Sequence, residues 1–599
     1  MTQLLPERAT IAARPAAPEW GSDVVAEVLR RLGIEYAALN PGASFRGLHD
    51  SLVNYLGNER PRIVLCNHEE VAVSIAHGYA KFAERAMAAI VHSNVGLMHA
   101  SMAVFDAWAD RVPVLVLGGN GPMDAARRRP WIDWIHTTHG QGLLVRDYTK
   151  WEHQPASVEA IPEALLRAWH AAHVEPAGPV YVAFDVSLQE QALEPGRIAL
   201  PDVSRYPLPE AIAPAPELVR QAASWLVEAE YPVILLGRTG RGERVWNDLV
   251  ALAEALGAAV LSDLKSAVSF PTNHPLHQAG LSTHPDEAAN EVLRRADVVL
   301  ALERIDVAGT LRGAKALGGA KLANVSLGHY ALRSAVQDQQ ELPPADLPIP
   351  ANVDRTVAAL LDAVRGALHD NPAARRRTED RARMHADRRT RLEAEWHRAN
   401  RETWEAHPIS LARLVGELRG ALGERARLAI RARGTLAWPN GVWDFVLPGA
   451  SLGGDGGGGI GSGPGMSVGV ALAASGSGRF VFSILGDGDM LMAPSALWTA
   501  AHMRIPLLFV LANNQTYMND EEHQERVAIA RGRPLENKWI GQRMDDPPVD
   551  FAALASSMGV EGIGPVIEPD ELAGAFRRAV AAVGEGRPAL VDVRIGRGS

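Results

Sequence analysis

The chain has 599 residues, of which 47% are hydrophobic and 22% charged. This length is too great for one hydrophobic core, and the composition is that of a globular protein with about three domains of ordinary size. The formal net charge of −10, without any basic tract, argues against a nucleic-acid-binding protein. The one cysteine, Cys66, excludes an internal disulfide and fits a cytoplasmic protein, and no membrane-spanning or secretory segment is recognisable.

The N-terminal part begins with 18 residues rich in Ala and Pro, which are typical of an arm. A helix is then predicted from Val24 to Leu32, with Ser22 as a suitable cap. Short apolar runs that suit buried strands follow at residues 36–39, 63–66, 87–91, 112–117 and 178–185. Because helical segments separate these runs, we expect a parallel sheet with helices on both faces.

A second α/β unit follows a linker, rich in Pro and acidic residues, at about 186–210. Its expected strands lie at residues 232–236, 258–261 and 296–301. The segment Gly237–Arg241 after the first of them resembles a dinucleotide-binding loop, but its glycines do not complete a Gly-x-Gly-x-x-Gly pattern. Residues 371–407 are dense in Arg, Glu and Asp, so we expect a solvated helical connector.

The third α/β unit contains the stretch with the clearest chemistry, Gly486–Asn514. An apolar run precedes the glycine turn Gly486–Asp489, and a second apolar run ends at Asn513 and Asn514. A lone glycine turn has no functional meaning by itself. If the two runs are neighbouring parallel strands, however, Asp487 and Asn514 meet at the edge of the sheet where such folds bind ligands. A carboxylate and an amide oxygen suit Mg²⁺ or Ca²⁺ bridging a diphosphate.

This stretch resembles the diphosphate-binding motif of thiamine-diphosphate enzymes. The resemblance implies that Asp487, Asn514 and the backbone carbonyl of Thr516 bind Mg²⁺. It also implies that the cofactor lies against the turn formed by Gly486, Asp487, Gly488 and Asp489. Asp489 departs from the family, which often has Ser there, so an acid would face the diphosphate unless it points away.

The segment His68–Ala80 resembles the pyrimidine-binding module of the same enzymes, in which a glutamate opens a helix with an Ala-x-Gly-Tyr-Ala segment. Glu69 is the matching residue, although an acid at a helix start is also simply a favourable partner of the helix dipole. In the glycine-rich run before the predicted helix 466–474, Ile460 matches the bulky residue that bends the cofactor. Gly458 would offer its carbonyl to the cofactor amino group.

The resemblance extends over nearly the whole chain, in the order found in acetolactate synthases, benzoylformate decarboxylases, pyruvate decarboxylases and 2-hydroxyacyl-CoA lyases. We therefore expect an α/β protein with three doubly wound parallel-sheet domains. The expected parts are an arm (1–18), a pyrimidine-binding domain (19–188), a middle domain (210–368), a connector (371–407) and a diphosphate-binding domain (408–599). The middle domain binds FAD or ADP in some members, and neither is expected here, though that alternative stays open.

The reaction implied is cleavage or formation of a C–C bond in a 2-oxoacid or related carbonyl compound. Glu69 would act on the cofactor, and Asp520 and His136 would move protons on the substrate, with His139 or His523 nearby. Alternatively, Asp520 belongs to a solvated helix start and His136 stacks on Trp131 or Trp134. Two other functions stay open, a 2-hydroxyacyl-CoA lyase and a non-catalytic cofactor-binding protein. The family also implies a homodimer or homotetramer.

Overall fold

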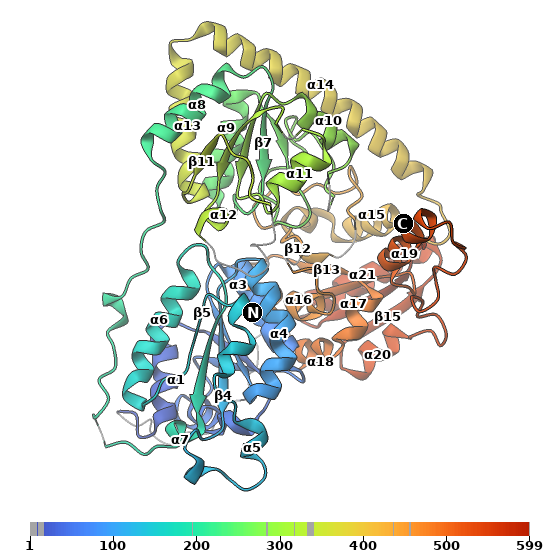
Figure 1. The fold of residues 1–599 in the computed structure, drawn as a ribbon. Coiled ribbons are helices and arrows are strands. Elements are labelled where there is room, and N and C mark those ends of the chain that lie inside the picture. The colour runs from blue at the N-terminus through green and yellow to red at the C-terminus, as the bar shows by residue number, and fades with distance from the viewer. Residues whose placement is uncertain are drawn as a thin grey trace. The chain divides into compact units, whose positions relative to one another are not determined.

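The computed structural model describes residues 7, 9, 17–194, 196–282, 285–316, 318–331, 341–434, 437–454 and 457–597. Most of the expected arm at 1–18 lies outside them. The chain forms three α/β sheets, as expected, and divides into two compact units (Figure 1). The first unit contains residues 1–209, 455–567 and 575–598, and the second contains 210–454 and 568–574. No helix within the described ranges is long and apolar enough to cross a membrane.

The N-terminal sheet belongs to the first unit and has the strand order β2-β1-β3-β4-β6-β5, with every pairing parallel. Its strands are β1 (Tyr36–Leu39), β2 (Arg62–Leu65), β3 (Met87–Val91), β4 (Val114–Asn120), β5 (Trp151–His153) and β6 (Val180–Asp185). The chain passes from β1 to β2 on one side and from β3 to β4 on the other side. The loops that follow β1 and β3 therefore diverge, and this is the place where such sheets bind ligands.

Helices cover both faces of this sheet. Helices α1 (Gly21–Arg31) and α6 (Ile161–His173) share a hydrophobic core with one face, and α3 (Glu69–Ala83) and α4 (Ser93–Ala109) contact β3 and β4. The remaining helices here are α2 (Arg46–Asp50), α5 (Asp133–His136) and α7 (Val186–Gln189). The predicted cap Ser22 is wrong, because Trp20 is the N-cap residue and the Asp23 carboxylate accepts its backbone N–H at 3.0 Å.

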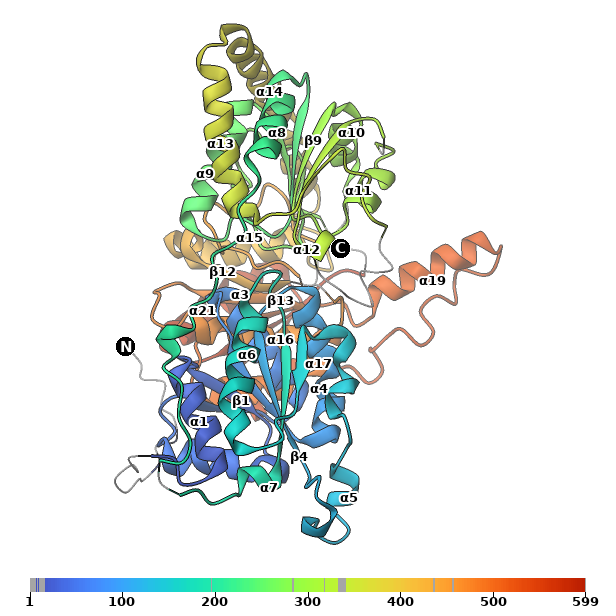
Figure 2. The same ribbon diagram turned by 60° about the vertical axis from the view of Figure 1, so that its left-hand side comes forward.

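The C-terminal sheet of the same unit contains parallel strands in the order β13-β14-β16-β15. These are β13 (Val481–Gly486), β14 (Leu508–Asn513), β15 (Glu561–Val566) and β16 (Ala589–Arg594). The helices are α16 (Ser462–Ala473), α17 (Asp487–Met492), α18 (Ser495–His502), α19 (Met518–Ala530), α20 (Phe551–Ser557) and α21 (Leu572–Gly584). Figure 2 shows α19 extending away from its sheet.

The second unit has its own parallel sheet, in the order β11-β10-β9-β7-β8. Its strands are β7 (Pro232–Leu236), β8 (Ala259–Leu261), β9 (Val298–Leu302), β10 (Lys321–Val325) and β11 (Leu347–Ile349). Helices α8 (Pro216–Glu228), α9 (Glu243–Leu256) and α13 (Val353–His369) pack on one face, and α10 (Glu287–Arg295) and α11 (Val307–Gly313) on the other. This unit also holds α12 (Gly328–Ala331), α15 (Leu411–Leu422) and β12 (Ile430–Gly434).

The charged connector forms the long helix α14 (Pro372–Glu402), which runs along the second unit (Figure 1). The expected helical connector is solvated over most of its residues, but Arg381, His385, Arg388 and Arg389 are buried. Arg388 donates to the backbone carbonyl of Gln278 at 2.6 Å, and Arg389 donates to that of His277 at 3.0 Å. The arginines thus satisfy backbone acceptors of the unit and hold the helix against it.

His385 is the least compensated of these groups. Its side chain is fully buried, it lies edge-on to Tyr231, and its ring nitrogens have no hydrogen-bond partner among the residues that the structure describes. Burial lowers the pKa of His385 to about 4, and the charges of Arg388, Arg295 and Arg381 add to the effect. The imidazole is therefore neutral in the folded protein at pH 7.

This neutral imidazole should make the second unit acid-sensitive. Below about pH 6.5 the unfolded chain binds a proton on this histidine that the folded chain does not bind, so stability falls by up to about 1.4 kcal/mol per pH unit until pH reaches the folded pKa. Between pH 7 and pH 5, we expect the free energy of unfolding of His385→Phe to fall by about 2 kcal/mol less than that of the parent protein. Urea unfolding of the second unit measures this difference.

His397→Phe is the matched control, because His397 is exposed on the same helix. It should follow the parent protein at both pH values. The same acid sensitivity in the parent and in His385→Phe would contradict the assignment.

Candidate functional site

A serine and a histidine pair at the carboxyl ends of two neighbouring strands of the N-terminal sheet. Ser44 follows β1 and His92 follows β3, and Ser44 Oγ lies 2.8 Å from His92 Nδ1. Ser44 Oγ also accepts the backbone N–H of Ser93 at 3.0 Å, which fixes the hydroxyl. Since Nδ1 is engaged, Nε2 is the ring nitrogen of His92 that is left to exchange a proton with a bound molecule.

His136 joins this pair from the last turn of α5. Its ring is edge-on to His92, with centroids 4.6 Å apart and planes at 69°. Burial lowers the pKa of His92, the charge of His136 lowers it further, and Glu69 acts in the opposite direction. The structure therefore brings the predicted residue His136 to a partly buried histidine, whereas Trp131 and Trp134 are exposed.

Glu69 is the first residue of α3 and directly follows the loop after β2. Only 5% of the residue is exposed, and the helix N-terminus favours its negative charge. The carboxylate lies between two residues of α4. Its Oε2 is 3.4 Å from His99 Nδ1, and its Oε1 would be 2.8 Å from a Cβ placed on Gly96.

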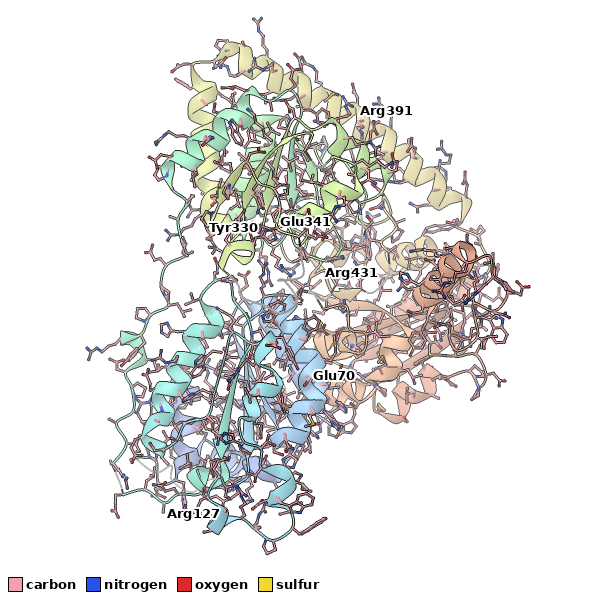
Figure 3. All side chains as sticks on the ribbon, in the orientation of Figure 1. Glu70, Arg127, Tyr330, Glu341, Arg391 and Arg431 are labelled. Atoms are coloured by element: carbon pink, nitrogen blue, oxygen red, sulfur yellow. The ribbon has the colours of Figure 1, made fainter. Side chains whose placement is uncertain are left out.

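Glu70 turns toward the C-terminal sheet of the same unit (Figure 3), where its Oε1 would be 3.7 Å from a Cβ on Gly461. Burial raises the pKa of Glu70, and the charge of Asp489 raises it further. Asp489 Oδ1 accepts the backbone N–H groups of Gly461 at 2.6 Å and Gly463 at 3.3 Å. The unusual acid of the glycine turn therefore points to the start of α16, which explains how the turn accommodates it.

The expected metal ligands lie where two parallel strands end. β13 and β14 are neighbours with Gly486 opposite Ala512, so Asp487 and Asn514 follow the same edge of the sheet. Asp487 Oδ1 accepts the N–H of Gly488 at 3.0 Å, while Oδ2 is buried and has no hydrogen-bond partner within the described part of the chain. Burial raises the pKa of Asp487 to about 6.

Asn514 and Thr516 form a tight turn beside this carboxylate. Asn514 Oδ1 accepts the N–H of Thr516 at 3.1 Å, and Gln515 between them has a left-handed φ of 57°. The Thr516 hydroxyl donates to Glu521, which is buried in the first turn of α19 and lies 3.5 Å from Arg543. Glu521 thus stabilises the turn through the Thr516 hydroxyl.

These oxygens fit a hard divalent cation that also binds a diphosphate. The set comprises one carboxylate, one amide oxygen and one backbone carbonyl, which are the ligand types of Mg²⁺. Across the described ranges, no group of three or more His, Cys, Asp or Glu residues is arranged to hold a metal. The remaining positions around the ion would therefore be filled by phosphate oxygens and water.

The glycine run before α16 lies against α4. A Cβ on Gly457 would be 2.1 Å from Asp106 Oδ1, and one on Gly459 would be 2.1 Å from Met102 Cε. Gly458 has a φ of 72°, which other residues adopt only with strain, and Ile460 is 39% exposed at the start of α16. The structure thus leaves the side chain of Ile460 accessible to a ligand.

Other predicted residues are placed less centrally. Asp520 is exposed in the first turn of α19, and His523 and His139 are exposed too. Three residues that the sequence reasoning did not select are close to the site, namely Ser44, His92 and Glu521. The signal for Ser44 and His92 was their position at strand ends, but only the strand order shows that β1 and β3 are neighbours.

Comparison with protein families gives matches along most of the chain. Residues 19–143 match the model of a thiamine pyrophosphate enzyme, N-terminal TPP binding domain. Residues 219–360 match its central domain, and residues 435–593 match its C-terminal TPP binding domain. Thiamine pyrophosphate and thiamine diphosphate are two names of one cofactor.

Full-length relatives are similar to the chain at modest identity. A benzoylformate decarboxylase of Pseudomonas aeruginosa is 27% identical, over 95% of this chain and 97% of its own length. A probable acetolactate synthase large subunit of Methanocaldococcus jannaschii is 25% identical, over 96% and 92%.

Two solved structures share the fold. A thiamine diphosphate-dependent 4-hydroxybenzoylformate decarboxylase of Rhodococcus jostii RHA1 aligns with a TM-score of 0.75 at 22% identity, over 96% of this chain and 99% of that one. A benzoylformate decarboxylase of Polynucleobacter necessarius aligns with a TM-score of 0.73 at 18% identity, over 97% and 99%.

The metal half of the site can be tested with a neutral isostere. Asp487→Asn removes a buried charge, so the cofactor-free protein should be at least as stable as the parent. It should also lose the rise in melting temperature that thiamine diphosphate with Mg²⁺ gives the parent, because affinity falls by about 100-fold or more.

Asp489→Asn is the matched control in the same turn, since its amide oxygen can still accept from α16. It should keep most of the rise in melting temperature. A full rise in Asp487→Asn, or an equal loss in both variants, would show that Asp487 does not hold the metal.

Proposed function

Because the chain belongs to the thiamine pyrophosphate enzyme family, and is a thiamine-diphosphate-dependent enzyme of the decarboxylase and acetolactate synthase kind, we propose that it decarboxylates a 2-oxoacid. The group formed by Ser44, His92 and His136 beside Glu69 carries this proposal. A partly buried imidazole whose Nδ1 is engaged can give and take a proton at Nε2.

The cofactor would be held at both ends by this chain's residues. Glu69 would share a proton with the pyrimidine ring, Ile460 would support the bent shape, and Gly458 would accept from the amino group. Asp487, Asn514 and the Thr516 carbonyl would bind Mg²⁺, and Gly486–Asp489 would line the diphosphate. When bound, thiamine diphosphate supplies a carbon nucleophile and an electron sink for the departing carboxylate.

The histidines would donate protons to the substrate and accept protons from it. His92 is the stronger candidate of the two, because Ser44 fixes its ring while His136 helps to keep it uncharged. His136 would serve as the second imidazole. Asp520 stays part of the proposal as an acid on α19, although its side chain is exposed in the single chain.

Benzoylformate is the first substrate to test, because benzoylformate decarboxylases stand among both the relatives and the similar structures. Joining of the cleaved fragment to an aldehyde or a second 2-oxoacid is the related reaction to measure in parallel. Cleavage of a 2-hydroxyacyl-CoA and cofactor binding without turnover are the remaining alternatives.

A substrate screen tests the proposal directly. With thiamine diphosphate and Mg²⁺, the parent protein should release CO₂ from at least one 2-oxoacid in a panel containing benzoylformate and pyruvate. Glu69→Gln should still bind the cofactor and lose about 100-fold or more in turnover, because an amide keeps the shape but cannot share the proton.

Two results would contradict the proposal. Cleavage of 2-hydroxyacyl-CoA substrates without decarboxylation would support the lyase, and cofactor binding without any turnover would support a non-catalytic protein. Full turnover by Glu69→Gln would place the essential acid elsewhere.

We propose further that the site is completed by a second copy, in a homodimer or homotetramer. In the resembling enzymes the pyrimidine-binding domain of one subunit faces the diphosphate-binding domain of another. Within one chain Glu69 lies against α4 and close to His92, and Asp487 lies against Gly488, Gln515 and Asp592.

A mixing experiment distinguishes shared sites from sites within one chain. Glu69→Gln and Asp487→Asn carried on differently tagged, co-expressed chains should each be inactive alone. Their random dimers should recover about a quarter of the parent activity, because each mixed dimer has one intact site. No recovery in purified mixed dimers would mean that each chain builds its own site.

A further inference from the structure

The Glu69 carboxylate is flanked on both sides by α4, and only one of the two contacts can act chemically. Gly96 provides space for Oε1, since a Cβ there would be 2.8 Å from that oxygen. His99, one turn further along α4, places Nδ1 3.4 Å from Oε2. The glycine thus permits one orientation of the carboxylate, and the histidine places a ring nitrogen at ion-pair distance from it.

His99 is itself held in place by a second histidine. Its ring stacks on His68 with centroids 5.0 Å apart and planes at 5°. His68 caps α3, accepting the backbone N–H of Glu70 at its Nδ1 at 3.1 Å. The His99 side chain is 63% exposed, so it can stay next to Glu69 without any cost of burial.

We propose that His99 is a positioning residue, which donates a hydrogen bond from Nδ1 to Oε2 of Glu69 and keeps the carboxylate directed at the pyrimidine ring of the cofactor. This inference rests on the proposed role of Glu69. The other charged and titratable groups near the pair are His68, Glu70 and His92. Glu70 is repelled by the charge of Asp489 and attracted by that of His99, and His92 pairs with Ser44. If Glu69 is already restrained before the cofactor binds, binding costs less conformational entropy.

The proposal predicts that a donor, rather than the shape of the side chain, is what matters at residue 99. His99→Leu fills similar space without a donor, and we expect its dissociation constant for thiamine diphosphate to rise about tenfold. His99→Gln restores an N–H donor and should stay within about threefold of the parent. His49→Gln, at an exposed histidine on α2, is the matched control and should leave the constant unchanged.

Isothermal titration calorimetry with thiamine diphosphate and Mg²⁺ measures these constants. Gly96→Ala serves as a positive control, because its methyl group displaces the carboxylate from the opposite side. Parent affinity in His99→Leu, or an equal loss in His99→Leu and His99→Gln, would overturn the proposal.

An NMR measurement tests the contact without any cofactor. In protein labelled with ¹⁵N-histidine, the ring signals of His99, assigned from their loss in His99→Gln, should shift when Glu69 is replaced by Gln. Unchanged signals would overturn the pairing. Failure of the proposed function looks different, because the parent protein would then release no CO₂ from any 2-oxoacid of the panel, whatever the cofactor affinities of the residue-99 variants are.

Discussion

Parallel pairing of buried strands is the constraint on which both halves of the site depend. In a parallel sheet every strand ends at the same edge, and the polar residue after each strand therefore lies beside the one after its neighbour. β1 and β3 bring Ser44 to His92 in this way, and β13 and β14 bring Asp487 to Asn514. The rigid apolar strands position the side chains, while the loops supply the chemistry.

Close packing of α3 on α16 is the second constraint within this unit. A Cβ on Gly78 would lie 2.1 Å from the carbonyl oxygen of Met466, and one on Gly469 would lie 2.0 Å from that of Ile75. Only glycine permits this approach of two backbones. Since Glu69 and Glu70 open α3, the same contact fixes where these two acids stand relative to Asp489 and the start of α16.

The sequence was sufficient for the parallel α/β architecture and for the most apolar strands, whereas β5, β10, β11, β12, β15 and β16 were not predicted. Buried runs such as Met87–Val91 and Pro232–Leu236 agree with the strands residue for residue, because length and β-branched content mark them without tertiary information. Asp487 stood out because it lies in a glycine turn after a buried strand, and Glu69 because the segment around it resembles a pyrimidine-binding module.

Contacts between distant segments could not be predicted. The Ser44 to His92 pair needs the strand order, and the direction of Asp489 needs the position of α16. Likewise, a charge-rich stretch gave no sign that α14 buries arginines on backbone carbonyls, because the acceptors are more than a hundred residues away along the chain.

The middle domain has a similar strand reversal, and there the chain's own side chains take up backbone hydrogen-bond donors at the edge of the sheet. Its strand order reverses between β7 and β9, where a crevice would form, and Gly237 follows β7. A Cβ on Gly237 would lie 2.0 Å from the backbone oxygen of Glu303, so this glycine serves close chain packing. The Glu303 carboxylate accepts the N–H groups of Leu327 at 2.9 Å and Gly328 at 3.1 Å.

An internal carboxylate thus occupies backbone donors that a phosphate would otherwise use at such an edge. Arg304 and Asp263 add a buried ion pair beside it, with Arg304 also donating to the carbonyl of Leu236 at 3.3 Å. In the N-terminal sheet the residues at the strand reversal, Ser44 and His92, pair through a hydrogen bond that engages Nδ1 of the imidazole. The two strand reversals therefore differ physically, because in the middle domain a carboxylate of the chain accepts the backbone N–H groups, whereas in the N-terminal sheet the reversal presents an imidazole.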